Sequence, residues 1–154
     1  MKARSVATIK GFAWSEATSL HPGWLAVLER VPLFQALSKR HLRKVGQLAE
    51  MKRFKKGVQV VRAGARGDAF YVILDGGAEV ETPKGHKRTL SEGDYFGELA
   101  LLDGAPRAAT VTATGVLTTA CIGRTGFLKL VKEEPSIGVG LANGLVALVR
   151  DMQK

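Results

Sequence analysis

The chain has 154 residues, 45% hydrophobic, 24% charged and 6% aromatic, with a formal net charge of +9. These values suit one globular domain and exclude a large multidomain protein and a disordered chain. The single cysteine, Cys121, can form no disulfide within the chain, and no run of about 18 apolar residues is present, so we expect a cytoplasmic protein without a membrane span.

The N-terminal region divides into an arm and a helical segment. Residues 1–22 show no clear periodicity and are predicted to form a flexible arm, so the domain is expected over residues 23–154. Apolar residues recur at helical spacing over 24–51, with a break at Pro32 and with Ser38 as the expected N-cap of the second helix. The segment therefore predicts two short helices joined at Pro32.

Basic residues are concentrated in the first 66 positions, which carry 14 Lys or Arg and three acids. The densest stretch, residues 39–56, offers a surface for nucleic acid, anionic lipid or an acidic protein. Sites for single-stranded nucleic acid interleave aromatic and basic side chains, and here only Phe54 does so. A solvated helix face is therefore the favoured interpretation.

Short strand-like runs bounded by glycine occupy residues 54–122. Residues 70–74 form a buried-strand candidate that ends in an Asp-Gly-Gly turn, and residues 78–82 alternate apolar and polar side chains. The other predicted strand runs are residues 58–61, 87–90, 109–113 and 116–122. Many short, regularly spaced strands are typical of an antiparallel sandwich, jelly roll or barrel. The sequence therefore predicts a mainly β, α+β fold.

The C-terminal region, residues 125–152, returns to a helical pattern that restarts at Pro135. Its apolar side chains form a stripe: Leu141, Leu145, Leu148, Val149 and Met152. The stripe indicates packing on the barrel or on a partner helix, or a lid over a ligand.

One run inside the strand region, residues 93–109, does not follow the strand pattern and carries the candidate chemistry. Residues 98–102 are predicted to form a short helical turn directly after Gly97, where amides without intrahelical partners favour an anion. Arg107 can add a bidentate hydrogen bond to the same anion, and Glu98 can accept hydrogen bonds from a sugar hydroxyl. This set suits a phosphorylated ribose.

The run Phe-Gly-Glu-Leu-Ala-Leu-Leu, followed after a short gap by Pro-Arg-Ala-Ala-Thr-Val, resembles the phosphate-binding cassette of the cyclic nucleotide-binding domain. The resemblance covers about residues 24–152, with residues 31–34 similar to the family's helical entrance and residues 126–128 similar to its hinge. It implies an antiparallel, jelly-roll-like β-roll with short N-terminal helices, a short cassette helix and C-terminal hinge or lid helices.

The resemblance also implies roles for single residues. Arg107 would pair with the cyclic phosphate, Glu98 would bond the ribose 2′-hydroxyl, and Val80, Leu90 and Arg88 would lie near the base. The implied ligand-binding residues are Val80, Leu90, Gly97, Glu98, Leu99, Ala100, Arg107, Ala108 and Ala109, with the amides of Gly97, Ala100 and Ala108 bonded to phosphate or sugar oxygens. The implied hinge and lid residues are Phe127, Leu128, Leu145 and Val149.

The function implied by this resemblance is a sensor or regulatory module that binds cyclic AMP (cAMP), moves its C-terminal helices and performs no catalysis. Cyclic GMP binders of the family often place Thr or Ser directly after the cassette arginine, whereas this chain has Ala108, so cyclic GMP is expected to bind more weakly. No cofactor or metal ion is expected. An effector protein or a second copy of the chain is an expected partner of the C-terminal helices.

Two alternatives differ in class from a free-standing sensor. The chain also suits a ligand-binding fragment of a cAMP-responsive transcription regulator, channel or kinase regulatory subunit, although no helix-turn-helix follows before Lys154 and DNA binding by this chain is not expected. A metal-dependent, cupin-like enzyme is disfavoured, because His21, His41 and His86 lie in three different segments.

Overall fold

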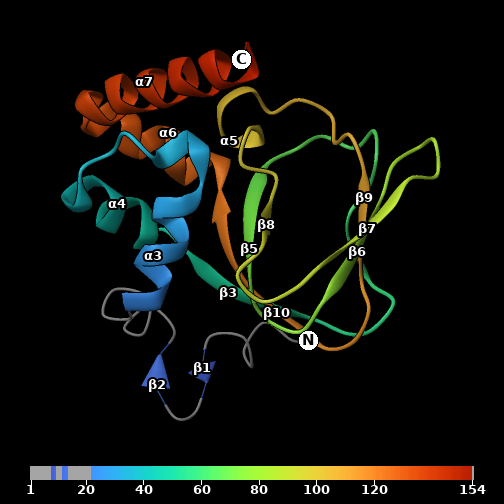
Figure 1. Ribbon diagram of the computed structural model, residues 1–154. Coiled ribbons are helices and arrows are strands. Elements are labelled where there is room, and N and C mark those ends of the chain that lie inside the picture. The colour runs from blue at the N-terminus through green and yellow to red at the C-terminus, as the bar shows by residue number, and fades with distance from the viewer. Residues whose placement is uncertain (1–7, 10–11, 14–21, 154) are drawn as a thin grey trace.

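Two four-stranded antiparallel sheets form a roll, and the helices lie on the outer side of the first sheet (Figure 1). The computed structural model describes residues 8–9, 12–13 and 22–153. It confirms the predicted antiparallel β-roll with flanking helices. The arm predicted to be flexible, residues 1–22, is described only in part. The described part consists of β1 (Thr8–Ile9) and β2 (Phe12–Ala13), which pair with each other, and of Pro22, the first residue of the first helix. The rest of the predicted arm lies outside the described residues.

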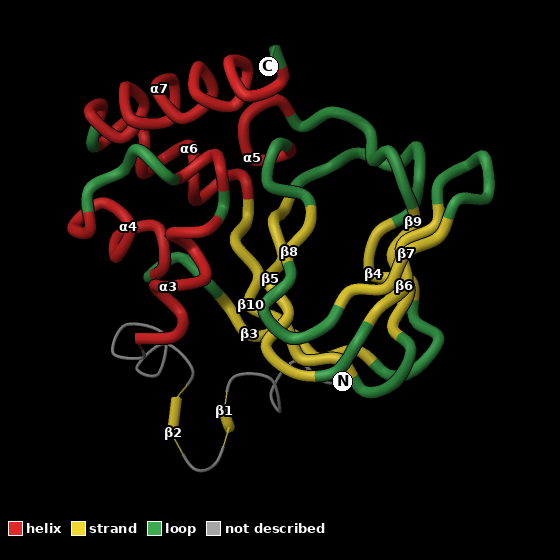
Figure 2. The backbone as a smooth tube through the Cα atoms, in the orientation of Figure 1, coloured by secondary structure: helices red, strands yellow, loops and turns green. Residues whose placement is uncertain are grey.

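The strand order is β3-β10-β5-β8 in the first sheet and β4-β9-β6-β7 in the second (Figure 2). The first sheet consists of β3 (Glu50–Phe54), β5 (Ala69–Asp75), β8 (Tyr95–Phe96) and β10 (Leu117–Gly123). The second consists of β4 (Gln59–Val61), β6 (Ala78–Glu81), β7 (Lys87–Leu90) and β9 (Thr110–Ala113). Six of these strands match predicted runs, whereas β3 and β8 were not predicted.

The helices before the roll are α3 (Pro22–Arg30), the 3-10 helix η1 (Pro32–Phe34) and α4 (Lys39–Gly46). Ser38 is the N-cap of α4, as predicted, and its hydroxyl accepts a hydrogen bond from the His41 amide at 3.1 Å. After the roll come α6 (Arg124–Glu133) and α7 (Pro135–Met152), which begins at the predicted proline.

The predicted helical segment over 24–51 is too long at its C-terminal end. α4 stops at Gly46, and Met51 lies in β3, where it pairs with Ala120 of β10 and is 3% exposed. The pairing partner is distant in sequence, so local spacing gave no sign of it. Tertiary pairing with β10 overrides the helical spacing of Leu48 and Met51.

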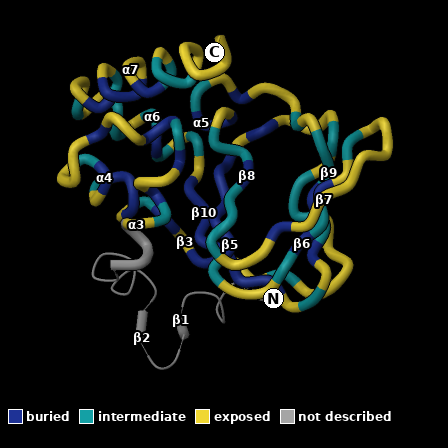
Figure 3. Tube along the Cα trace, in the orientation of Figure 1, coloured by how far each residue is buried: buried dark blue, intermediate teal, exposed yellow. Residues whose placement is uncertain are grey.

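Two hydrophobic clusters occupy the two faces of the first sheet (Figure 3). Between the helices and this sheet, Phe34 lies edge-on to Phe70 at 5.8 Å and also contacts Phe127 at 6.2 Å between ring centroids. Between the two sheets, Tyr71 stacks on Phe96 at 5.0 Å. Successive residues of β5 therefore point into different clusters, as strand geometry requires.

α7 packs on η1 through a face that contains two glycines. The buried residues of α7 are Ile137, Gly140, Leu141 and Gly144. Of the predicted stripe, Leu141 is buried and Leu145 and Leu148 are half-buried, but Val149 and Met152 are 51% and 78% exposed. These last two side chains do not pack on the roll, because the close approach at Gly144 fixes the inner face and Val149 follows it by about 140° of helix rotation. Their predicted contact with a partner helix or a ligand stays a prediction.

None of the helices in the described ranges is both long enough and apolar enough to span a membrane.

Candidate functional site

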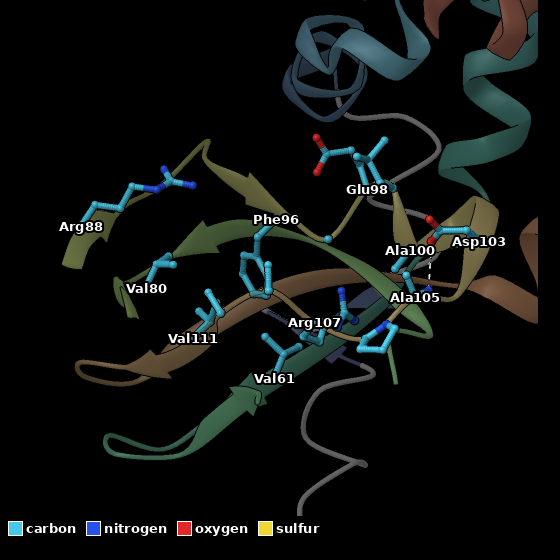
Figure 4. Close-up of a pocket in the computed structure, with 15 residues that line it drawn as sticks. Val61, Val80, Arg88, Phe96, Glu98, Ala100, Asp103, Ala105, Arg107 and Val111 are labelled. Atoms are coloured by element: carbon cyan, nitrogen blue, oxygen red, sulfur yellow. Dashed lines mark hydrogen bonds between the residues drawn. The ribbon is translucent and has the colours of Figure 1, made fainter. Parts of the chain in front are cut away.

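A cavity of about 370 Å³ lies between the second sheet and the segment that connects β8 to β9 (Figure 4). This volume is at the lower end of the range of small-molecule sites, roughly 300–1,000 Å³. The lining residues are Val61, Val80, Arg88, Phe96, Gly97, Glu98, Leu99, Ala100, Asp103, Ala105, Pro106, Arg107, Ala108, Ala109 and Val111. Eight of the nine predicted ligand-binding residues are among them.

Arg107 is fixed at the cavity by hydrogen bonds from both its backbone and its side chain. Its amide donates to the Ala65 carbonyl at 2.7 Å, and its own carbonyl accepts from the Gly64 amide at 2.8 Å. The guanidinium Nη2 donates to the Ala69 carbonyl at 2.7 Å. A guanidinium carries five N–H donors, and within the described ranges Ala69 is the one protein acceptor that the Arg107 side chain uses, which leaves donors for an anion in the cavity.

Gly97 and Gly67 allow the backbone to approach Arg107 closely. Gly97 has φ +85°, and the Ala69 carbonyl oxygen and Arg107 Nη1 occupy the space that a Cβ would take. A Cβ at Gly67 would lie 2.8 Å from both the Cβ of Ala100 and the Ala105 carbonyl oxygen. The cassette therefore depends on two glycines that are 30 positions apart in sequence.

The helical turn predicted over residues 98–102 is present. Residues 98–99 form a turn, and the helix α5 (Ala100–Asp103) follows directly. Its first bonds run from the Ala100 amide to the Gly97 carbonyl and from the Leu101 amide to the Glu98 carbonyl, both at 3.2 Å. The Ala100 amide, which the resemblance assigns to the ligand, thus already has a backbone acceptor.

The sequence and fold both match one family. The family model of the cyclic nucleotide-binding domain matches residues 51–134, more than half of the chain. The chain belongs to the cyclic nucleotide-binding domain family. This family assignment agrees with the resemblance found in the cassette, and residues 51–134 contain all lining residues and all of the roll except Glu50 of β3.

Curated relatives of this cyclic nucleotide-binding domain include two fungal proteins named cAMP-dependent protein kinase regulatory subunit. The one from Mycosarcoma maydis is 47% identical over 89 residues, which are 55% of this chain and 17% of the relative. The one from Emericella nidulans is 43% identical over 112 residues, 69% of this chain and 26% of the relative. The chain thus spans about a quarter or less of the length of these relatives.

Solved structures show the same fold. The N-terminal domain of a transcriptional regulator from Streptomyces coelicolor A3(2) has a TM-score of 0.71 at 25% identity and covers 82% of this chain and 94% of its own. The regulatory subunit of a cAMP-independent protein kinase A from Trypanosoma brucei has a TM-score of 0.63 at 21% identity, covering 91% of this chain and 47% of its own. The second likeness shows the fold alone.

Glu98 lies at the cavity, and none of the residues that the structure describes forms an ion pair with it. It is half-buried, and among the described residues it forms no salt bridge with Arg107. Figure 4 shows its carboxylate on the opposite side of the cavity from the Arg107 guanidinium. Burial and, secondarily, the Glu98 carboxylate raise the pKa of the neighbouring Tyr95. The loop therefore presents a carboxylate and a guanidinium that are separately available to a ligand.

An apolar wall completes the domain's cavity opposite the cassette. Val80 of β6 pairs with Val111 of β9 on one side and with Arg88 of β7 on the other, and all three line the cavity. Among the lining residues, the sequence interpretation missed Val61, Phe96, Asp103, Ala105, Pro106 and Val111. The inward alternation of β9 signals Val111, but Val61 is placed by pairing with a strand far along the chain.

Leu90 is the one predicted ligand-binding residue that does not line the cavity. It follows Arg88 by two residues on the same face of β7, but it is 2% exposed and pairs with Ala78. Its side chain belongs to the cluster between the two sheets. The strand continues past the cavity at this point, so Leu90 lies in the core beside it.

The predicted hinge and lid residues lie away from the cavity of this domain. Phe127 is fully buried among the helices, Leu128 and Leu145 are half-buried against the same cluster, and Val149 is exposed. Every lining residue comes from the range 61–111, so neither α6 nor α7 covers the cavity. In this structure α7 packs on η1 and does not reach the cavity, so the movement of α7 over a bound ligand stays a prediction.

The remaining titratable groups inside the roll are a thiol and a phenol. Burial raises the pKa of the Cys121 thiol and the pKa of the Tyr71 phenol. In the part of the chain that the structure describes, no three His, Cys, Asp or Glu side chains gather as a metal centre would need.

Proposed function

We propose that this domain binds cAMP in the cavity and that Arg107 pairs with the cyclic phosphate. The observation that carries the proposal is the Arg107 guanidinium, which is anchored on the Ala69 carbonyl and still lines the cavity with unused donors. Arginine suits phosphate because its planar fork matches two oxygens at once. The sequence similarity to proteins named cAMP-dependent protein kinase regulatory subunits favours the adenine nucleotide.

In the proposed complex, Glu98 accepts a hydrogen bond from the ribose 2′-hydroxyl, and the amides of Gly97 and Ala108 bond phosphate or sugar oxygens. The base lies against Val80 and the apolar wall, with Arg88 beside it. Ala108 offers no hydroxyl to a guanine amino group, so we expect cyclic GMP to bind more weakly. No cofactor or metal ion takes part in this binding.

We infer further that the domain acts as a cytoplasmic regulatory module without catalytic activity. Relatives named as kinase regulatory subunits support a role in which ligand binding changes contacts with another protein, and the chain also suits a fragment of such a subunit. One structural neighbour is named cAMP-independent, so the identity of the nucleotide needs a direct measurement.

Isothermal titration calorimetry tests the proposal with cAMP, cyclic GMP and 5′-AMP. We expect one cAMP site per chain at micromolar strength, about −8 kcal/mol, with weaker binding of the other two nucleotides. Unchanged cAMP after incubation, read by chromatography, would agree with binding without turnover. Absence of heat at saturating cAMP, together with an unchanged melting temperature, would refute the assignment.

Two arginine variants localise the site. Arg107→Ala removes the only side-chain cation of the cassette and is expected to weaken cAMP binding at least tenfold, because a desolvated phosphate then loses about 2–5 kcal/mol of pairing. Arg62→Ala is the matched control, since Arg62 is exposed and does not line the cavity. Equal affinities of folded Arg107→Ala and Arg62→Ala would remove Arg107 from the site.

A further inference from the structure

Arg124 connects the end of the cassette helix to the first C-terminal helix. Its guanidinium Nη2 donates a hydrogen bond to the Leu102 carbonyl at 2.9 Å, and its backbone amide donates to the Asp68 carbonyl at 2.8 Å. Leu102 lies in the last turn of α5, where carbonyls lack intrahelical partners. Arg124 is also the first residue of α6. The first residue of α6 thus provides, through its side chain, a hydrogen-bond donor for a carbonyl at the end of α5.

Gly104 makes room for this contact. It ends α5 with φ +61°, and a Cβ at this position would lie 3.2 Å from Arg124 Nε and 3.4 Å from Arg124 Cζ. Arg124 Nε is itself buried and has no hydrogen-bond partner within the described residues. Within the described residues, packing against Gly104 and the hydrogen bond to Leu102 hold the guanidinium, and the unpaired buried Nε makes this arrangement less stable.

α6 is tied to a different element at its other end. Glu134, the residue after α6, forms salt bridges with Lys44 and Arg40 of α4, the latter at 3.4 Å. Between the two ends, Phe127 is fully buried in the cluster that also contains Leu101 of α5. A displacement of α5 can therefore reach α6 by two routes: the Arg124 hydrogen bond and the apolar packing around Phe127.

We propose that the Arg124 side chain is a positioning residue that couples occupation of the cavity to α6 and α7. The inference rests on the proposed function, because it needs a ligand that displaces α5. Arg124 does not line the cavity, and its backbone bond to Asp68 persists in any side-chain variant. Loss of the guanidinium therefore leaves the ligand contacts and the start of α6 in place and removes only the link to Leu102.

Hydrogen exchange with and without saturating cAMP tests the coupling in three proteins: the parent, Arg124→Met and Arg124→Lys. Methionine keeps an apolar stem without donors, whereas lysine keeps a cationic donor for the Leu102 carbonyl. In the parent we expect cAMP to change exchange in both 97–109 and 124–152. In Arg124→Met the change at 97–109 persists and the change at 124–152 shrinks about fivefold or more, and Arg124→Lys retains both.

A glycine pair tests the same contact from the other side. Gly104→Ala pushes on the guanidinium and is expected to reproduce Arg124→Met. Gly85→Ala is its matched control, because Gly85 also has a positive φ, +88°, but a Cβ there meets nothing within 4 Å. The control is expected to retain the full exchange response to cAMP.

The outcomes separate the inference from the proposed function. If the parent binds cAMP by calorimetry and Arg124→Met keeps its whole exchange response at 124–152, the coupling role is refuted and the apolar route carries the signal. A merely structural role would give this same result with a lower melting temperature. If the parent shows no cAMP binding, the proposed function fails and the inference fails with it. Should Arg124→Met not fold, Arg124→Lys against Gly104→Ala decides the question.

Discussion

Alanine substitution of two glycines in α7 should change the stability of the domain in opposite directions: Gly138→Ala should raise it and Gly144→Ala should lower it. A Cβ at Gly144 would lie 2.6 Å from the Leu33 carbonyl oxygen and 3.2 Å from both the Leu33 carbonyl carbon and the Pro32 carbonyl oxygen. All three are backbone atoms of η1, so no side-chain rotation relieves the clash and α7 must move outward. A Cβ at Gly138 would meet only Val131 Cγ1, at an ordinary 3.5 Å.

The magnitudes follow from two opposing effects. Alanine stabilises a helix interior by about 1 kcal/mol relative to glycine, and overpacking costs about 1–3 kcal/mol. Gly138→Ala has only the first effect and should raise the melting temperature by about 2–4 °C, since 1 kcal/mol corresponds to that shift in a domain of this size. Gly144→Ala has both effects, and the overpacking outweighs the helix gain because the neighbouring atoms are rigid backbone. We expect a net loss of about 1–2 kcal/mol, which lowers the melting temperature by roughly 2–8 °C.

Thermal unfolding followed by circular dichroism, with urea midpoints as a second measure, checks both variants. Urea slopes equal to that of the parent would show that stability alone has changed. A Gly144→Ala protein as stable as the parent would mean that α7 does not approach η1 as closely as described. A destabilised Gly138→Ala would contradict the assignment of Gly138 to an open part of the helix surface.

Two further predictions concern selectivity and pH. Ala108→Thr should lower the ratio of the cyclic GMP to the cAMP dissociation constant by about 2–10-fold, as one added hydrogen bond is worth about 0.5–1.5 kcal/mol, and an unmoved ratio would place selectivity elsewhere. The Lys44 hydrogen bond and the charge of Arg40 lower the pKa of Glu134 from its usual 4.5. Because the pKa is lower in the folded state, the ionised carboxylate stabilises the domain above about pH 4.5. This stabilisation is lost as the pH falls through the lowered pKa. Melting temperatures of the parent and Glu134→Gln should therefore differ at pH 7 and converge once the pH lies below the lowered pKa of Glu134, and a constant difference would argue against the salt bridges.

Sequence patterns predicted strands where glycine turns bracketed an apolar run, as in β5. They failed for β3, because Lys52 and Arg53 interrupt its apolar alternation and its pairing partner, β10, lies at the far end of the roll. Local spacing also did not indicate that Val149 is exposed, because the orientation of α7 depends on the glycine contact with η1 and not on the number of apolar residues.

The candidate site was predictable to the extent that it is contiguous in sequence. Arg107, Glu98 and the cassette glycine share one run of the chain, so their residue types and spacing pointed to a phosphate and a sugar. Val61 and Val111 reach the cavity through the register between β4 and β9, which includes a shift that no local pattern encodes.

The position of β10 has a consequence for how the domain forms during synthesis. β10 is the last of the described strands in chain order, yet it lies between β3 and β5 in the first sheet and pairs with both. Until residues 117–123 leave the ribosome, β3 has no partner and β5 has one open edge. Such unpaired edges can associate with other chains. The nascent protein therefore passes through a stage in which nearly the whole roll has been translated but the first sheet still lacks the strand between β3 and β5.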